Sequence, residues 1–229
     1  MNSPNSRFVI AIDGPSGAGK STVAHLLSQR LGVPLLDTGA MYRCLALAAM
    51  SQGWPSQPIE TVLPTISAAK IDFTGAGRQV VTLNGEDVSQ KIRSLEVSQA
   101  ASKLSTVSEI RRQLVAQQQA IIASGSWVLE GRDVTTVVAP DANLKVFLTA
   151  SIEERARRRW KEYQAKGGQE TLQTVVKEVV ERDFRDYTRD DSPLQLAEDA
   201  VIVESFGLTP EEVADRILSL LPDLPGVVN

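Results

Sequence analysis

The feature that most constrains the fold is a glycine-rich stretch near the start of the chain, residues 11–22, which read AIDGPSGAGKST. It contains the spacing Gly14-x-x-x-x-Gly19-Lys20-Ser21, which fits the phosphate-binding loop. Glycine lets backbone N–H groups converge on an anion, because no Cβ stands in the way. An apolar run precedes the stretch and an amphipathic pattern follows it, which predicts a strand, a turn and a helix. The sequence therefore predicts a nucleotide phosphate site at the start of a helix.

The residue types of the loop suggest how it would work. We expect Lys20 to reach the β- and γ-phosphates of ATP and the Ser21 hydroxyl to bind Mg²⁺. Glycine-rich turns between a strand and a helix also occur without a ligand, and the loop alone fits kinases, ATPases and switches. The residues of this expected nucleotide phosphate site are Gly14, Pro15, Ser16, Gly17, Ala18, Gly19, Lys20, Ser21 and Thr22.

Strand-like and helix-like patterns alternate along most of the chain. Strands are predicted at 8–12, 34–37, 127–130, 144–149 and 200–204. Helices are predicted at 20–31, 40–51, about 95–123, 152–164, 171–186 and 210–221. Short apolar strands separated by helices are typical of a parallel sheet covered by helices on both faces. The expected fold class is therefore α/β.

One region, residues 71–92, departs from this alternation. It contains IDFT, then Gly75-Ala76-Gly77, then QVVTL, and Asn84-Gly85 before EDV. Asn-Gly between strand-like runs is a strong hairpin signal, so we expect a small antiparallel insert. The stretch Asp72-Phe73-Thr74-Gly75 matches the Asp-x-x-Gly of GTPases. The sequence contains no guanine-reading Asn-Lys-x-Asp, so we interpret that match as chance.

Composition excludes several functional classes. The 229 residues, 42% of them hydrophobic, suffice for one sizeable domain with an inserted part. A net charge of −4 argues against a general nucleic-acid partner, and the single Cys44 excludes an intramolecular disulfide or a multi-cysteine zinc site. No apolar run has the length of a membrane span, and the first residues lack the apolar core of a signal peptide. We expect a cytoplasmic protein without a membrane partner, and a monomer by default.

Four polar groups could complete a phosphoryl-transfer site. Two follow predicted strands, where ligands bind in open α/β sheets: Asp37 to Arg43, and Glu130-Gly131-Arg132-Asp133. The others lie on predicted helices, where each could instead be a solvated face. They are Arg155, Arg158 and Arg159 on one helix, and Arg182, Asp186 and Arg189 on the next. The loop 164–168 between these helices could act as the hinge of a lid.

Together these motifs resemble bacterial cytidylate kinases, the CMP/dCMP kinases of the nucleoside monophosphate kinase family. The resemblance rests on AIDGPSGAGKST, LLDTGAMYR, EGRDVTTVVAPDA, SIEERARRR and RDFRDYTR, and it covers roughly residues 7–220. It implies a single P-loop kinase domain with an NMP-binding insert at about 64–100 and a lid at about 155–170. It also implies transfer of the γ-phosphoryl group of ATP to CMP or dCMP.

The resemblance assigns roles to individual residues. It implies that Arg43, Arg132 and Arg189 bind the CMP phosphate, and that Arg182 and Asp186 bind the sugar. The base would be read by Ser102, Arg111 and Asp133, with Thr38 and Tyr42 also at the acceptor. The implied catalytic residues are Lys20, Asp37, Arg132, Arg155, Arg158 and Arg159. Two positions vary within the family: some members have Asp where this chain has Glu130, and Gly where it has Ser21.

The chemistry agrees with this inventory of residues. An acceptor phosphate, with a second pKa near 6, is mostly a dianion at neutral pH and needs no strong base. Arginines, Lys20 and Mg²⁺ would offset the charge of two polyanions brought together. UMP, shikimate or dephospho-coenzyme A remain alternative acceptors, and a slowly hydrolysing nucleotide switch is the alternative from another class.

Overall fold

The computed structural model describes residues 7–74, 80–165 and 167–221. The chain divides into two compact units, one formed by Met1–Leu36 with Ile122–Asn229 and the other by Asp37–Ile121. Each is described by itself. Among the described helices, none has both the length and the apolar character that crossing a membrane requires.

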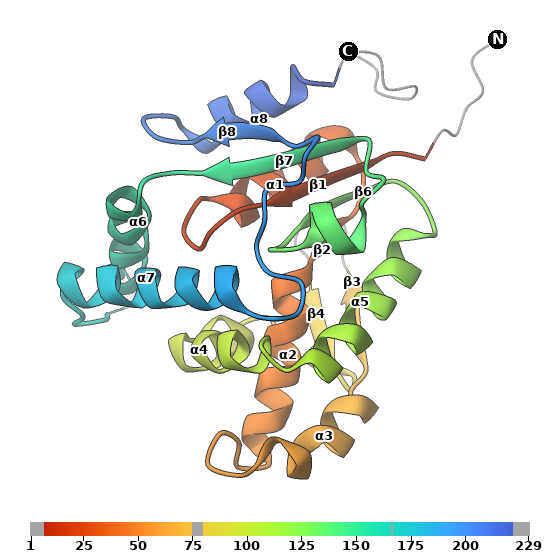
Figure 1. The fold of residues 1–229 in the computed structure, drawn as a ribbon, viewed down its shortest axis with the longest axis vertical. Coiled ribbons are helices and arrows are strands. Elements are labelled where there is room, and N and C mark those ends of the chain that lie inside the picture. Colours follow the sequence, from red (N-terminus) through yellow and green to blue (C-terminus); the bar gives the residue numbers. More distant parts are fainter. Residues whose placement is uncertain (1–6, 75–79, 166, 222–229) are drawn as a thin grey trace. The chain divides into compact units, whose positions relative to one another are not determined.

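The first unit is built on a five-stranded sheet (Figure 1). The strand order is β2-β6-β1-β7-β8, and β1 pairs in parallel with both β6 and β7, as β7 does with β8. The central strand is apolar along nearly its whole length because it is covered on both faces. The strands are β1 (Val9–Asp13), β2 (Leu35–Asp37), β6 (Trp127–Glu130), β7 (Leu144–Thr149) and β8 (Val201–Glu204).

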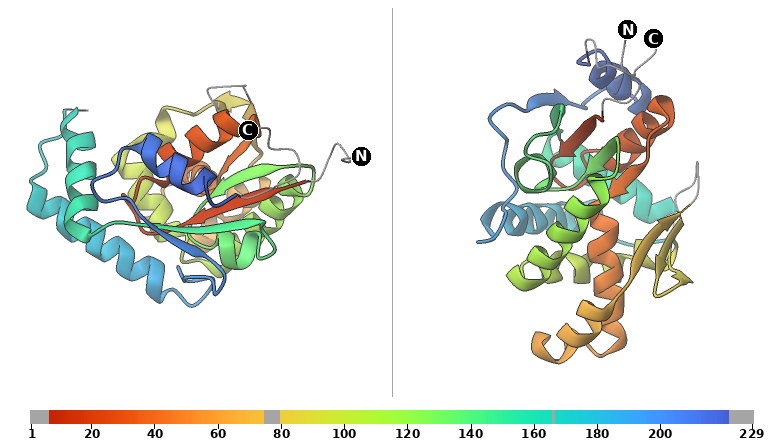
Figure 2. Two further views of the ribbon diagram at one scale, coloured as in Figure 1. Left: turned by 90° about the horizontal axis from the view of Figure 1, so that it is seen from above. Right: turned by 90° about the vertical axis from the view of Figure 1, so that its right-hand side faces the viewer.

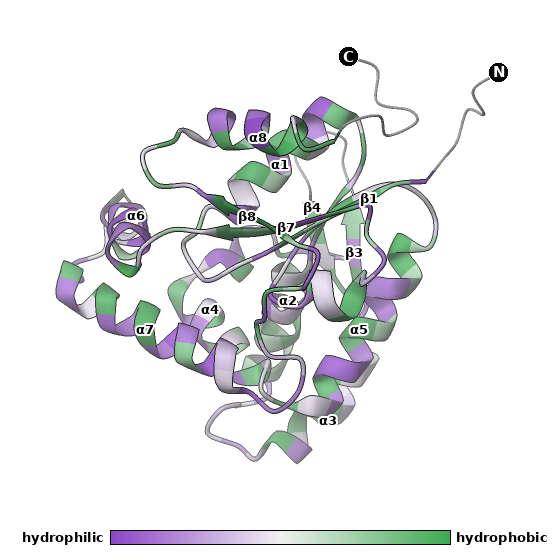
Figure 3. Cartoon of the chain, turned by 45° about the horizontal axis from the view of Figure 1, so that its top comes forward, coloured by the Kyte–Doolittle hydropathy of each residue, from purple (hydrophilic) through white to green (hydrophobic). Residues whose placement is uncertain are grey.

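Helices flank this sheet, as the sequence predicted. Helix α1 (Lys20–Leu31) and helix α8 (Pro210–Leu218) lie side by side, and their apolar residues share a core with Ile10 and Ile12 (Figure 2). Colouring by hydropathy separates the apolar strands from the largely hydrophilic helix α6 (Ile152–Ala165) (Figure 3). Helix α6 packs instead against α7 (Leu172–Thr188) through a small core of their own.

The described residues of the second unit form four α-helices and the predicted antiparallel sheet. Its strands pair in the order β3-β4-β5. Asn84 and Gly85 join β4 to β5 with φ of 53° and 84°, which confirms the hairpin signal. The stretch Gly75-Ala76-Gly77 of the predicted insert lies outside the described residues. The elements are α2 (Thr38–Ser51), α3 (Ile59–Ala68), β3 (Ile71–Thr74), β4 (Val80–Leu83), β5 (Glu86–Asp87), a 3₁₀ turn η1 (Lys91–Arg93), α4 (Leu95–Leu104) and α5 (Ser108–Ile122).

Two predicted helices differ from the structure, and one observed helix was not predicted. The single helix expected over about 95–123 is two, because the chain breaks after α4. There the Ser105 and Thr106 hydroxyls donate to the carbonyl oxygens of Ser102 and Lys103, which replaces the helical hydrogen bonds. The sequence also gave no prediction for α3, which contains Pro64, and the last helix ends at Leu218 rather than at 221.

Candidate functional site

The predicted phosphate-binding loop joins β1 to α1 in a conformation that requires glycine. Gly14, Gly17 and Gly19 have φ of 145°, 79° and 96°, a region that other residues rarely adopt. A Cβ on Gly14 would lie 2.0 Å from the carbonyl oxygen of Leu148, and one on Gly17 would lie 2.9 Å from that of Arg155. The loop backbone therefore lies directly against the end of β7 and the first turns of α6.

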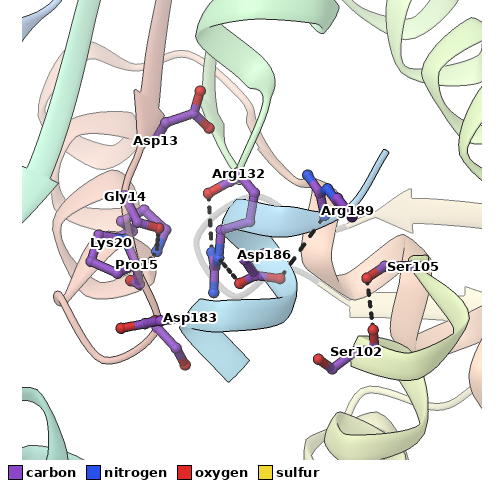
Figure 4. A network of polar contacts seen from close by, with 12 residues as sticks. Asp13, Gly14, Pro15, Lys20, Ser102, Ser105, Arg132, Asp183, Asp186 and Arg189 are labelled. Carbon is purple, nitrogen blue, oxygen red and sulfur yellow. Dashed lines mark hydrogen bonds and ion pairs between the residues drawn. The ribbon is translucent and has the colours of Figure 1, made fainter. Parts of the chain in front are cut away.

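Lys20 is the first residue of α1, and its side chain turns back into the loop (Figure 4). The buried Nζ donates hydrogen bonds of 2.8 Å to the carbonyl oxygens of both Gly14 and Pro15. Burial, followed by the positive charge of Arg132, holds the pKa of Lys20 well below its usual range, while Glu130 acts in the opposite direction. A second anionic group would therefore favour the charged form of this lysine.

Arginines from two elements surround a buried carboxylate on α7. The Nε of Arg132, which follows β6, donates to Asp186 Oδ2 at 2.9 Å, and Arg189 Nη1 lies 3.9 Å from Asp186 Oδ1 (Figure 4). Burial raises the pKa of Asp186, but the charges of Arg132, Arg182 and Arg189 outweigh it and hold that pKa below its usual range. This carboxylate is therefore ionised at neutral pH.

The structure brings the loop and this arginine group together within the first unit. Arg132 and Arg182 both lower the pKa of Lys20, so their charges lie close enough to act on it. Burial alone would lower the pKa of Arg132, but Asp186 and Glu130 raise it, and its guanidinium stays charged. Lys20 on α1, Arg132 after β6 and Arg182 on α7 thus lie close enough together for their charges to interact.

Arg155 on α6 is part of the packing between the loop and α7. Its guanidinium donates to the carbonyl oxygens of Ala150 at 2.9 Å and Ser16 at 3.0 Å, and it forms an ion pair of 2.7 Å with Asp183. Only 4% of Arg155 is exposed. The alternative of a solvated face is therefore wrong for this residue.

Arg158 and Arg159 lie on the same helix but differ in their contacts. Arg158 donates to the side chain and backbone oxygens of Ser205 at 2.9 and 2.8 Å, and to the carbonyl oxygen of Ala18 at 3.4 Å. Arg159 donates to the hydroxyl of Tyr163 at 2.8 Å and so points along its own helix. Of the two, only Arg158 contacts the phosphate-binding loop.

In the second unit, Asp37 and Arg43 form one group at the start of α2. Asp37 is the N-cap, and its Oδ1 accepts a 2.8 Å hydrogen bond from the backbone N–H of Ala40. Its other oxygen forms a 2.7 Å ion pair with Arg43. Thr38, the first residue of this helix, is buried.

Three predicted acceptor residues group around the break between α4 and α5. The guanidinium of Arg111 lies 5.5 Å from the ring centre of Tyr42 and donates to the carbonyl oxygen of Ser105 at 3.2 Å. Ser102 is buried on the preceding turn (Figure 4). Arg111 is only 1% exposed, so the stack and the hydrogen bond hold a buried charge in place.

The metal prediction depends on Ser21. Its side chain is exposed at the start of α1, directly after Lys20. Across the described ranges, no three His, Cys, Asp or Glu side chains gather as a metal cage. Mg²⁺ keeps several waters and takes few protein ligands beside substrate phosphates, so one exposed hydroxyl fits it.

Asp13 is a buried residue of this site that the local pattern did not point to. It ends β1, immediately before Gly14, and accepts hydrogen bonds from Val134 and Thr135. Its only signal in the sequence is a carboxylate at the end of an apolar strand. The partners lie more than a hundred positions away, so the sequence alone could not supply them.

Comparison with known proteins gives matches over almost the whole chain. Residues 10–223 match the family described as cytidylate kinase. A protein named cytidylate kinase from Caldicellulosiruptor saccharolyticus is 44% identical over 92% of this chain and 94% of its own. One of the same name from Solibacter usitatus is 46% identical over 94% and 92%.

A solved structure is similar at the level of the fold. It is an uncharacterized protein from Eubacterium ventriosum, with a TM-score of 0.53 and 13% identity, and the match covers 93% of this chain and 98% of the other. At this identity the likeness concerns the α/β fold alone.

The Arg155–Asp183 pair generates a stability prediction. Asp183→Ala should lower the free energy of unfolding by about 3 kcal/mol, because it leaves a buried guanidinium without its counter-charge. The double variant Arg155→Met/Asp183→Leu should recover much of this loss, because neither of the two buried side chains then carries a charge. Urea unfolding would measure both.

The matched control is Asp215→Ala, which breaks the exposed pair between Asp215 and Arg30. It should cost less than about 1 kcal/mol. Equal losses in Asp183→Ala and Asp215→Ala would contradict a stabilising role of the buried pair.

Proposed function

Because the chain belongs to the cytidylate kinase family, as its motifs predicted, we propose that it transfers the γ-phosphoryl group of ATP to CMP or dCMP. The products are ADP and CDP or dCDP. One observation carries the proposal: the first unit places Lys20 of the glycine loop in the same electrostatic environment as Arg132 and Arg182. That is the charge distribution that transfer between two phosphorylated molecules requires.

On the donor side, the loop from Gly14 to Thr22 holds the ATP phosphates. Lys20 exchanges its neutral carbonyl partners for the β- and γ-phosphates. Ser21 would supply a hydroxyl ligand to Mg²⁺, which when bound would neutralise charge on the transferring phosphoryl group.

Each unit, taken by itself, carries a proposed set of acceptor residues. From the first unit, Arg132 and Arg189 bind the acceptor phosphate, Arg182 and Asp186 bind the sugar, and Asp133 reads the base. From the second unit, the proposed residues are Asp37, Thr38, Tyr42, Arg43, Ser102 and Arg111. We also propose an NMP-binding insert at about 64–100 and a lid at about 155–170. We propose that the protein is a monomer in the cytoplasm.

The reaction needs charge stabilisation more than proton transfer. An oxygen of the acceptor phosphate attacks the γ-phosphorus, a new P–O bond forms, and the bond to the β-phosphate oxygen breaks as ADP leaves. The dianionic acceptor is already a nucleophile at neutral pH. Arg155, Arg158 and Arg159 are the proposed residues of α6 that oppose the charge of the transferring group.

A coupled assay of ADP formation tests the function directly. With ATP as donor, CMP and dCMP should give the highest kcat/KM in a panel that also contains UMP, AMP and shikimate. ATP consumption without an acceptor is the control. A higher kcat/KM for any other acceptor, or equal ATP consumption without one, would overturn the proposal.

Lys20→Ala should abolish transfer without unfolding the protein. The lysine contributes a charge and two loop hydrogen bonds, and it does not fill the apolar core. The measurements are kcat by the same assay and the unfolding midpoint. Activity equal to the wild type would refute the role of the phosphate-binding loop.

Arg158→Ala should lower kcat while the Kd for CMP changes little. Arg158 contacts the loop that would hold the donor, and arginines that engage a transferring phosphoryl group are worth roughly 10³-fold in rate. Arg157→Ala on the same helix is the control, since the Arg157 side chain is 56% exposed. If both variants keep a normal kcat, Arg158 has no part in the transfer.

Asp133→Ala should lose more activity with CMP than with UMP. A carboxylate accepts from the amino group of cytosine, whereas uracil presents a carbonyl oxygen there. A site built on such a hydrogen bond discriminates strongly. The measurement is kcat/KM for both acceptors, with the exposed Asp141→Ala as control. An unchanged CMP:UMP ratio in Asp133→Ala would mean that Asp133 does not read the base.

A further inference from the structure

Asp13 occupies the junction between the glycine loop and the chain that follows β6. It is the last residue of β1 and is 0% exposed. Side chains alternate along a strand, and Ile10 and Ile12 face the core formed with α1 and α8. Asp13 therefore points to the opposite face of the sheet.

On that face Asp13 binds the start of η2 (Val134–Val138), a single π-helical turn. Its Oδ1 accepts from the N–H of Val134 at 3.0 Å, and its Oδ2 accepts from the N–H and hydroxyl of Thr135 at 2.7 and 2.6 Å. These are N–H groups that the first turn of a helix cannot satisfy by itself. Both carboxylate oxygens are thus used on one short element.

The source of this cap is unusual. A helix is normally capped by the residue that precedes it, and Asp is among the favoured types. Here Asp133 precedes η2, yet it makes no side-chain capping bond to it. The capping bonds come instead from Asp13, at the end of β1.

The turn that Asp13 caps needs such support. The Asp133 carbonyl oxygen accepts from Val137 N–H at 2.9 Å and from Val138 N–H at 3.2 Å, and the Val134 carbonyl oxygen accepts from Ala139 N–H at 2.8 Å. Such wide turns are rare and are frequently found at functional sites. Arg132 and Asp133, the proposed acceptor residues, lie directly before it.

Burial of the Asp13 carboxylate disfavours its charged form. Burial raises the pKa of Asp13 to about 6, although its hydrogen bonds with Thr135 and Val134 act in the opposite direction. Since this pKa lies above the usual value for Asp, ionised Asp13 lowers the stability of the folded chain at neutral pH relative to acid pH. Packing alone would not require a carboxylate at this position.

We propose that Asp13 is a positioning residue for binding of the acceptor. The Asp13 carboxylate holds η2 in place and thereby fixes the backbone of Arg132 and Asp133. This inference rests on the proposed function. The chain itself joins Asp13 to Gly14, and a 3.0 Å hydrogen bond from Gly131 N–H to the Ile12 carbonyl oxygen makes a second connection. Asp13 therefore aligns the acceptor residues with the loop that holds the donor.

Asp13→Asn tests the inference, because it keeps the size of the side chain but places an amide NH₂ where an oxygen accepted. In this variant we expect KM for CMP to rise about tenfold and the CMP:UMP ratio of kcat/KM to fall. Because the Asp13 charge also acts on Lys20, KM for ATP is compared in Thr135→Val, where it should change less than about twofold. Thr135→Val, which loses the hydroxyl donor, should shift the same two quantities in the same direction. Thr135→Ser keeps that hydroxyl and should behave like the wild type.

The outcomes separate the inference from the function on which it rests. A wild type that does not phosphorylate CMP overturns both. With an active wild type, an unchanged KM for CMP and CMP:UMP ratio in Asp13→Asn and Thr135→Val overturn the inference alone. Equal rises in KM for ATP and CMP in Thr135→Val, or a loss of kcat there with both KM values unchanged, would also overturn it. If Asp13→Asn does not fold, the comparison of Thr135→Val with Thr135→Ser decides.

Discussion

The close approach of the glycine loop to β7 and α6 is the constraint on which the rest of the site depends. A Cβ on Gly14 would overlap the carbonyl oxygen of Leu148, and one on Gly17 would press on the backbone of Arg155. Because the loop backbone reaches these elements, Arg155 can bind the Ser16 carbonyl oxygen while it pairs with Asp183 on α7. The position of the loop thus fixes helices α6 and α7, which carry Arg155, Arg158 and Arg182.

The charges of the site follow from this placement. Lys20 lies buried near Arg132, with only neutral carbonyl oxygens as its hydrogen-bond acceptors among the described residues. Asp186 stabilises Arg132, and the surrounding arginines in turn keep Asp186 ionised. A bound polyphosphate would give Lys20 a charged partner, because it adds negative charge where burial and Arg132 disfavour the ammonium. The charge balance at the loop therefore favours an anion.

Much of this could be predicted from local sequence. The loop follows from glycine spacing, the strands β6 and β7 from short apolar runs, and the β4–β5 hairpin from Asn84-Gly85. The break before α5 could not be predicted, because the apolar periodicity continues through it. Helix α4 ends where the Ser105 and Thr106 hydroxyls donate to backbone carbonyl oxygens of its last turn. The roles of Asp13 and Arg155 depend on partners far away in the chain, which no local pattern contains.

The central claim is that the loop is a polyphosphate site centred on Lys20. Isothermal titration of the protein with inorganic tripolyphosphate, without nucleoside or metal, tests it most directly. The account predicts saturable binding at one site per chain. In Lys20→Ala the affinity should fall at least about tenfold, because one charge-assisted hydrogen bond is lost. No saturable binding, or equal binding by the wild type and Lys20→Ala, would contradict it.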